Sequence, residues 1–304
     1  MTKPVTNFAA SARARLLVVT KQRKDDFQLT LQRYVVERFL YRLGVSRYRD
    51  RFILKGAMLF MLWHKTGIRP TKDLDLAGYW SNDATSLAAA VGEICAIAYP
   101  QDGVEFSLKS IRVAPIRGAL EYHGFRVNLE VHLAAAVIPL QIDVGLGDLI
   151  VPEPVEVIYP VLLDGEPPRI RAYPREASIA EKLHAMVSHG EVNSRLKDFF
   201  DVYALSSVFT FQGSTMTAAI AATFSRRQSA SFSPWPVALT TDFYTDPSRC
   251  GQWDRYLVRT KLANAPADFG LLGERVREFL EAPARAVSEG RSFTAAWPPG
   301  GPWQ

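Results

Sequence analysis

Two aspartates, Asp73 and Asp75, stand one residue apart in the segment Arg69-Pro-Thr-Lys-Asp-Leu-Asp-Leu76. Successive side chains of a strand point to opposite faces, so both carboxylates project from one face, about 7 Å apart, while Leu74 and Leu76 enter a core. The two carboxylates repel each other unless cations lie between them, and a pair of divalent metals, as used in phosphoryl transfer, would supply those cations. A solvated strand end is the other interpretation of this motif.

Basic residues and a glycine turn precede the pair. Arg69 and Lys72 lie just upstream, where their charges could neutralise phosphate oxygens. One helix earlier, Gly56 follows the buried run Phe52-Ile-Leu-Lys55, and only a residue without a Cβ lets backbone N–H groups approach a phosphate closely. The combination favours a phosphate-handling site over a solvated strand end.

Asp143 is a candidate third carboxylate. It lies in the apolar run Ile138-Pro-Leu-Gln-Ile-Asp-Val144, where a charge is costly unless it is paired or coordinates a cation. If this strand lies beside the Asp-x-Asp strand, Asp143 joins the same metal site. If it does not, Asp143 is a satisfied aspartate near a strand end, and spacing alone leaves both alternatives open.

The elements that must position these side chains follow from periodicity. Apolar residues at helical spacing predict helices over residues 9–43, 86–99, 178–189, 195–205, 213–232 and 253–280. Short alternating runs predict strands over residues 104–108, 125–133 and 138–144, in a mixed or antiparallel sheet. The arginines in and after the first helix could form a basic surface or a solvated helix face; they are Arg33, Arg38, Arg42, Arg47, Arg49 and Arg51.

A proline-rich connector between residues 151 and 174 separates two predicted domains. Residues 1–150 combine the N-terminal helices with the sheet, and residues 151–304 are mainly helical, which together predicts an α+β fold. The tail, residues 297–304, is predicted to be disordered.

The overall composition is that of an ordinary globular protein. Of 304 residues, 48% are hydrophobic and 22% charged, and a net charge of +5 permits an anionic partner such as RNA or a nucleotide without requiring one. The sequence shows no signal peptide and no apolar run of membrane-spanning length, so we expect a cytoplasmic protein without a membrane partner.

The second half contains a group of charged residues whose spacing is explained by ion pairs along a helix. Lys182 lies in the first turn of the helix predicted to start at Ser178. In the next helix, Arg195, Asp198 and Asp201 stand three residues apart, which is typical of a salt-bridge ladder. Spacing alone therefore assigns them no catalytic role.

Several motifs together resemble the AbiEii/AbiGii toxin family. They cover residues 34–43, 52–58, 69–76, 140–145, 173–182 and 193–201, in the order found in the family. The family is similar to DNA polymerase β-type nucleotidyltransferases, so the resemblance implies a polymerase β-like mixed sheet with helices and a helical C-terminal domain. Its members are toxins of bacterial toxin–antitoxin and abortive-infection systems of phage defence, and characterised relatives add nucleotides to the 3′ end of tRNA.

The resemblance also implies roles for individual residues. Asp73 and Asp75 would ligate two Mg²⁺ ions, Asp143 would be the third carboxylate and general base, and Lys182 would contact the triphosphate with Asp198 beside it. The nucleotide-binding candidates are Lys55, Gly56, Arg69, Lys72, Lys182 and Arg195. The wider superfamily has serine after the turn glycine, whereas this chain has Ala57, so backbone N–H groups and nearby cations would have to hold that phosphate.

Three functions are consistent with the sequence. The first is a Mg²⁺-dependent toxin that transfers a nucleotide from an NTP to RNA, with the tRNA 3′ end as the expected acceptor and a cognate antitoxin as protein partner. The second transfers the nucleotide to a protein side chain. The third is an inactive relative that binds an antitoxin or nucleic acid, which the presence of all three carboxylates and Lys182 disfavours. Thr71 is a candidate for regulatory phosphorylation, because a phosphate there would compete with substrate phosphates for the metals.

Overall fold

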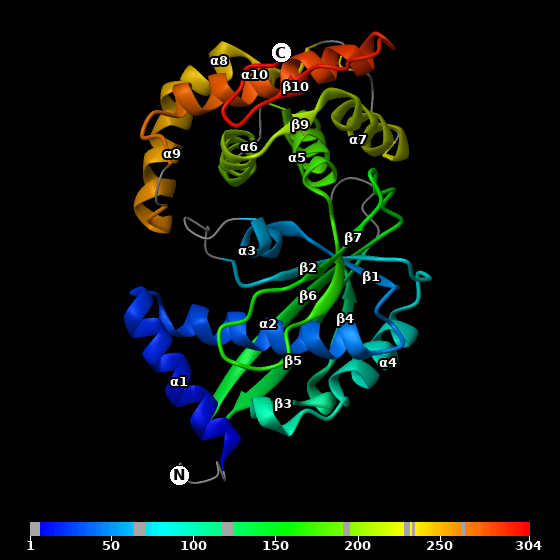
Figure 1. Cartoon of the computed structure of the whole chain (residues 1–304), viewed down its shortest axis with the longest axis vertical. Coiled ribbons are helices and arrows are strands. Elements are labelled where there is room, and N and C mark those ends of the chain that lie inside the picture. The colour runs from blue at the N-terminus through cyan, green and yellow to red at the C-terminus, as the bar shows by residue number, and fades with distance from the viewer. Residues whose placement is uncertain are drawn as a thin grey trace. The chain divides into compact units, whose positions relative to one another are not determined.

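The computed structural model describes residues 7–63, 71–116, 124–190, 195–227, 232, 235–262 and 265–304. Contacts divide the chain into two compact units, and Figure 1 labels most of their elements. Unit 1 comprises Met1–Asp148 and Val155–Ala172, and unit 2 comprises Leu149–Pro154 and Tyr173–Gln304. Part of the proline-rich stretch thus belongs to unit 1, because it supplies two strands to the sheet.

Unit 1 is a mixed sheet with helices, as predicted. Its helices are α1 (Phe8–Arg23), α2 (Phe27–Val45), α3 (Phe60–Trp63) and α4 (Ala84–Cys95). Its strands are β1 (Phe52–Lys55), β2 (Leu74–Gly78), β3 (Val104–Phe106), β4 (Arg112–Pro115), β5 (Gly124–Leu133), β6 (Ala136–Leu146), β7 (Val155–Ile158) and β8 (Arg169–Ala172). The strand order is β3-β5-β6-β2-β1-β8-β7, with β4 also paired to β5. The β2–β6 and β1–β8 pairs are parallel, and the other pairs are antiparallel.

Alternation of apolar and polar residues explains the longest strands. In β5, Val127, Leu129 and Val131 are buried, and the residues between them are exposed. Helix α2 packs against β6 and β8 and crosses the sheet in Figure 1, and its apolar residues join this core. Leu74 and Leu76 of β2 are buried as well, which confirms their predicted orientation.

Two predicted helices are each divided in two. The helix expected over residues 9–43 breaks at Lys24, which has a left-handed backbone with φ of 56°, and Asp26 then caps α2 by accepting the N–H of Leu29 at 2.9 Å. The helix expected over residues 253–280 likewise ends at left-handed Lys261 and restarts after the N-cap Asp268. Apolar residues at helical spacing lie on both sides of each break, whereas local capping decides where a helix ends.

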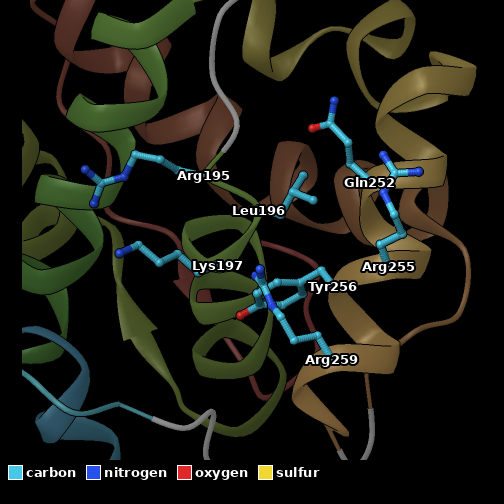
Figure 2. Close-up of a pocket in the computed structure, with 7 residues that line it drawn as sticks. All are labelled: Arg195, Leu196, Lys197, Gln252, Arg255, Tyr256 and Arg259. Carbon is cyan, nitrogen blue, oxygen red and sulfur yellow. The ribbon is translucent and has the colours of Figure 1, made fainter.

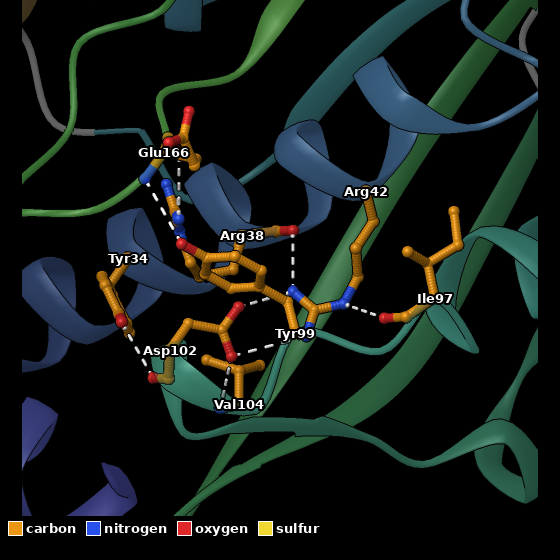
Figure 3. Close-up of polar contacts among 8 residues, drawn as sticks. All are labelled: Tyr34, Arg38, Arg42, Ile97, Tyr99, Asp102, Val104 and Glu166. Atoms are coloured by element: carbon orange, nitrogen blue, oxygen red, sulfur yellow. Dashed lines mark hydrogen bonds and ion pairs between the residues drawn. The ribbon is translucent and has the colours of Figure 1, made fainter. Parts of the chain in front are cut away.

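Arginines of α2 are buried inside unit 1, so neither a basic surface nor a solvated face describes Arg38 and Arg42. The Arg42 guanidinium donates to the Asp102 carboxylate at 2.6 Å (Figure 3). The Tyr34 hydroxyl donates to the Asp102 carbonyl at 2.8 Å, and Arg38 donates to the Glu166 carbonyl at 3.2 Å. These partners are far away in the sequence, so helical periodicity could not predict them.

Unit 2 is mainly helical, as predicted. Its helices are α5 (Arg175–His189), α6 (Leu196–Val208), α7 (Gly213–Arg226), α8 (Thr241–Thr245), α9 (Pro247–Thr260) and α10 (Phe269–Ser288), and two short strands, β9 (Phe211–Gln212) and β10 (Ala296–Trp297), pair with each other. Helix α10 packs against α6, α7 and α8, and α5 packs against α6 and α7. Within the described residues, no helix combines the length and apolarity needed to cross a membrane.

The prediction of a disordered tail was wrong. Trp297 is fully buried, and its indole N–H donates to the Ser206 carbonyl at 2.8 Å. Trp303 donates to the Phe279 carbonyl at 2.9 Å and stacks on the Phe279 ring with the centroids 5.6 Å apart. Prolines and glycines suggested disorder, but two tryptophans provide enough apolar area and two hydrogen bonds to hold the tail against α6 and α10.

Candidate functional site

A row of charged side chains crosses four neighbouring strands of unit 1. Lys55 of β1 is paired in register with Asp75 of β2, and Asp75 is paired with Asp143 of β6. On the other side of β6, Asp143 is paired with Arg126 of β5. Paired residues of adjacent strands project from the same face, so the row presents a cation, two carboxylates and a second cation. Asp73, which is exposed, precedes Asp75 by two residues.

Arg126, at one end of this row, forms an ion pair with Asp143. Its Nε and Nη2 donate to the two carboxylate oxygens of Asp143 at 2.8 and 2.7 Å. This hydrogen bonding, together with the charges of Asp143, Asp73 and Asp75, raises the pKa of the Arg126 guanidinium. Strand β6 lies directly beside β2, which is the arrangement that would bring Asp143 to the two other aspartates. Arg126 is a positive charge that interacts with all three carboxylates.

The donor set suits a hard divalent cation. Carboxylate oxygens are the ligands that Mg²⁺ prefers; Asp75 and Asp143 supply them from the adjacent strands β2 and β6, and Asp73 directly precedes β2. Within the described parts of the chain, no three Asp, Glu, His or Cys side chains are already arranged around a single metal position. Both oxygens of Asp143 contact Arg126, so a metal ligated by Asp143 would compete with this arginine for the carboxylate.

Gly56 allows the Asp75 carboxylate to lie against the backbone. Its φ is +73°, in the left-handed region. A Cβ at this position would lie 2.1 Å from Asp75 Oδ2, so a side chain would collide with the carboxylate. Glycine is therefore required here both for backbone geometry and for space. Ala57 follows in the turn and is buried, so its side chain offers a phosphate no hydroxyl.

The other predicted phosphate-binding cations of unit 1 differ in their surroundings. Lys55 Nζ contacts Asp148 Oδ2 at 2.6 Å, and only 8% and 10% of these two side chains are exposed. Lys72 is exposed, and its carbonyl accepts a hydrogen bond from Gln32 of α2 at 3.2 Å. Arg69 lies outside the described residues. Lys72 is therefore open to an anion, whereas Lys55 would have to share its charge with Asp148.

A second charged cluster is buried in unit 2. Lys182 of α5 contacts Asp201 at 2.6 Å and Asp198 at 3.4 Å, both on α6. Arg195 contacts Asp198 at 2.6 Å, which is the i,i+3 interaction that the spacing indicated. Burial opposes the charged form of Asp198, but the charges of Lys182 and Arg195 outweigh burial and hold the pKa of Asp198 below its usual value.

Sequence reasoning missed the partners of three predicted site residues. Arg126 shares the polar side of an alternating strand with other residues, and only the strand register singles it out. Asp148 follows a glycine turn, with nothing local to indicate that it pairs with Lys55. The position of Asp201 was noted, but its contact with Lys182 depends on how α5 and α6 pack.

Comparisons with known proteins identify a family that this chain resembles. A family model described as nucleotidyl transferase AbiEii toxin, type IV TA system, matches residues 38–282. No curated protein matches the chain. A crystal structure described as a candidate nucleotidyltransferase from H. pylori is 16% identical, with a TM-score of 0.48, and the match covers 87% of this chain and 96% of that one. The crystal structure of JHP933 from Helicobacter pylori is 16% identical, with a TM-score of 0.47 and coverage of 87% and 94%.

Proposed function

Since this chain belongs to the AbiEii family of nucleotidyltransferase toxins, we propose that it transfers a nucleotide from an NTP to the 3′-hydroxyl of an RNA, with tRNA as the acceptor. Two Mg²⁺ ions would bind at Asp73, Asp75 and Asp143. The observation that carries this proposal is the register that pairs Asp75 with Asp143 on parallel neighbouring strands, with Gly56 leaving space at Asp75.

The reaction exchanges the α–β phosphoanhydride bond of the NTP for a new phosphodiester bond. The 3′-oxygen of the RNA forms a bond to the α-phosphorus, the bond to the bridging oxygen breaks, and pyrophosphate leaves. Bound Mg²⁺ would supply the Lewis-acid chemistry that lowers the pKa of the hydroxyl and neutralises the leaving group. Asp143 would take the proton of the 3′-hydroxyl.

The protein's own cations would hold the triphosphate. Lys55, Lys72 and the turn that begins at Gly56 lie next to the carboxylate row in sequence and register. Lys182 and Arg195 of unit 2 stay candidate nucleotide contacts by family resemblance, and Asp198 and Asp201 hold the Lys182 ammonium in place. Such fixed charges stabilise negative charge that develops during transfer.

Membership in a toxin–antitoxin family implies a cognate antitoxin, and a toxin that modifies tRNA would act in the cytoplasm. Inhibition of growth would follow from blocked tRNA 3′ ends, because a terminus carrying an added nucleotide cannot be aminoacylated normally.

Labelled nucleotides test the proposal directly. The purified protein is incubated with each α-labelled NTP, Mg²⁺, and either total tRNA or total cellular protein. We expect label in RNA only. The Asp75→Asn variant should transfer at least about 100-fold more slowly, because it removes a metal ligand from the row while keeping the side-chain shape. Asp50→Asn, at an exposed aspartate outside the row, serves as the matched control.

The outcomes separate the alternative functions. Label found only in protein would establish the protein-acceptor alternative. An absence of Mg²⁺-dependent NTP binding in calorimetry would identify the chain as an inactive relative. Full transfer and full toxicity of Asp75→Asn, with an unchanged melting temperature, would show that the carboxylate row is not the metal site.

A further inference from the structure

A pocket of about 430 Å³ in unit 2 has a strongly basic lining. Residues of α9 and of the start of α6 line it from two sides (Figure 2). The lining residues are Arg195, Leu196, Lys197, Gln252, Arg255, Tyr256 and Arg259. Four of these seven are cations and none is a carboxylate, so the pocket favours an anionic ligand. We refer to it as the α6–α9 pocket.

The pocket has firmly packed walls. Its four residues on α9 follow the spacing i, i+3, i+4, i+7, so they share one helix face. The neighbouring Trp253 is fully buried and donates its indole N–H to the Pro266 carbonyl at 2.9 Å. The Trp253 ring packs against Phe200 of α6 and stacks on Tyr256 with the centroids 5.4 Å apart. These contacts fix the basic face of α9 opposite the start of α6.

Two guanidinium groups of the pocket are available to a ligand. Arg255 and Arg259 are both exposed, and within the described residues neither forms an ion pair with a carboxylate. By contrast, Arg275 and Arg285 on α10 are matched to glutamates on the same helix. The charges of Arg255 and Arg259 are therefore not matched in the way that those of Arg275 and Arg285 are.

We propose that the α6–α9 pocket binds the phosphodiester backbone of the acceptor RNA, an inference that rests on the proposed RNA-modifying function. Arg255 and Arg259 are one helical turn apart, about 6 Å along the axis. Their guanidinium groups are therefore arranged along the helix and do not converge on a single phosphate. A guanidinium binds phosphate oxygens in a bidentate manner. A linear series of singly charged phosphates suits this arrangement better than a compact triphosphate, and the Lys197 ammonium adds a further charge.

RNA binding without NTP or Mg²⁺ tests the pocket independently of catalysis. Fluorescence anisotropy with labelled tRNA, repeated at several KCl concentrations, compares wild type with Arg255→Ala/Arg259→Ala. The double variant should bind at least about tenfold more weakly, and the slope of log affinity against log salt should fall by about 1.5, because two phosphate contacts are lost. Arg255→Lys/Arg259→Lys should keep most of the slope, since it keeps both charges.

A matched control removes the same charge elsewhere. Arg275→Ala/Arg291→Ala alters two arginines of unit 2 that pair with glutamates and do not line the pocket. Circular dichroism checks that all variants fold, and calorimetry measures NTP binding with Mg²⁺. Equal RNA affinity and salt slope for the pocket and control variants would overturn the inference, as would a wild type that binds no RNA. A loss of NTP binding with RNA binding intact would overturn it in favour of a nucleotide site.

The same experiments separate this inference from the proposed function. If wild-type protein binds RNA through the pocket but transfers no label to it, the transfer reaction is wrong while the RNA contact stands. If label enters RNA at the wild-type rate in Arg255→Ala/Arg259→Ala and its affinity is unchanged, the reaction stands while the pocket assignment fails.

Discussion

Arg126 is the residue whose role changes most once the strand register is known. The sequence presents it as one polar residue among several in an alternating strand, yet its guanidinium binds the carboxylate of Asp143 through two hydrogen bonds. Residue types and local spacing predicted Asp73 and Asp75 as a pair on one face. They could not predict the compensating cation, because a cross-strand partner is chosen by pairing and not by sequence distance.

Removing this guanidinium should increase the response of the protein to Mg²⁺. In Arg126→Gln without metal, the three carboxylates lose one nearby positive charge, so we expect the free energy of unfolding to fall by about 1 kcal/mol or less, as for a partly exposed ion pair. Added Mg²⁺ should then raise the melting temperature of the variant more than that of wild type, because Asp143 no longer has to exchange partners. Differential scanning calorimetry with and without Mg²⁺ measures both effects.

Arg112→Gln on β4 is the control, since that side chain is exposed and, among the residues that the structure describes, donates only to nearby carbonyls. If Mg²⁺ stabilises Arg126→Gln and wild type to the same extent, Asp143 does not exchange Arg126 for a metal.

At the scale of secondary structure, helix α2 contains a carboxyl group whose burial makes the stability of the fold depend on pH. Glu37 is fully buried, accepts the N–H of Leu162 at 2.9 Å and pairs with Arg33 at 3.0 Å. Burial raises the pKa of Glu37 from 4.5 to about 7, although Arg33 and the Leu162 N–H act in the opposite direction. Between these values the folded state binds a proton that the unfolded state does not.

The free energy of unfolding should therefore fall as the pH rises from 4.5 to 7, by up to about 3 kcal/mol from this group. In Glu37→Gln this part of the pH dependence should disappear, because the amide cannot ionise. Urea unfolding of both proteins at pH 5 and pH 7 provides the comparison. An identical change in stability between the two pH values for wild type and variant would show that Glu37 has a normal pKa in the folded state.

Elements were more predictable than their arrangement. Alternation placed strands over 125–133 and 138–144, close to β5 and β6, because each strand buries only one face of its side chains. Contacts between distant segments decide the rest. They pair β6 with β2 in parallel, and they add β8 and β7 to the sheet beside β1. The breaks at residues 24 and 261 were missed because the apolar period continued on both sides of each cap.

On the scale of the whole molecule, the C-terminal residues complete the aromatic core of unit 2. Trp297, Trp303 and Phe279 contact one another, and the Trp297 side chain is fully buried. Composition alone pointed to disorder here, because proline and glycine content does not show whether the intervening tryptophans find a surface to cover.

Trp297→Ala should lower the free energy of unfolding by about 3–5 kcal/mol, since it creates a cavity and leaves the Ser206 carbonyl without its donor. Urea unfolding followed by far-ultraviolet circular dichroism measures this loss without relying on tryptophan fluorescence. Leu271→Ala on α10 is the control, because 67% of that side chain is exposed. Equal stability of the two variants would mean that the tail is not part of the core.

The charged row across β1, β2, β6 and β5 also has a consequence for the timing of toxicity in the producing cell. Asp75 leaves the ribosome well before Asp143, and neither lies beside the other until the β5–β6 hairpin has joined the sheet. A slip of β6 by one residue would turn Asp143 to the opposite face. If the toxin acts as proposed, incomplete and misregistered copies lack the paired carboxylates and should therefore be inactive, so activity requires the whole sheet to be assembled in register.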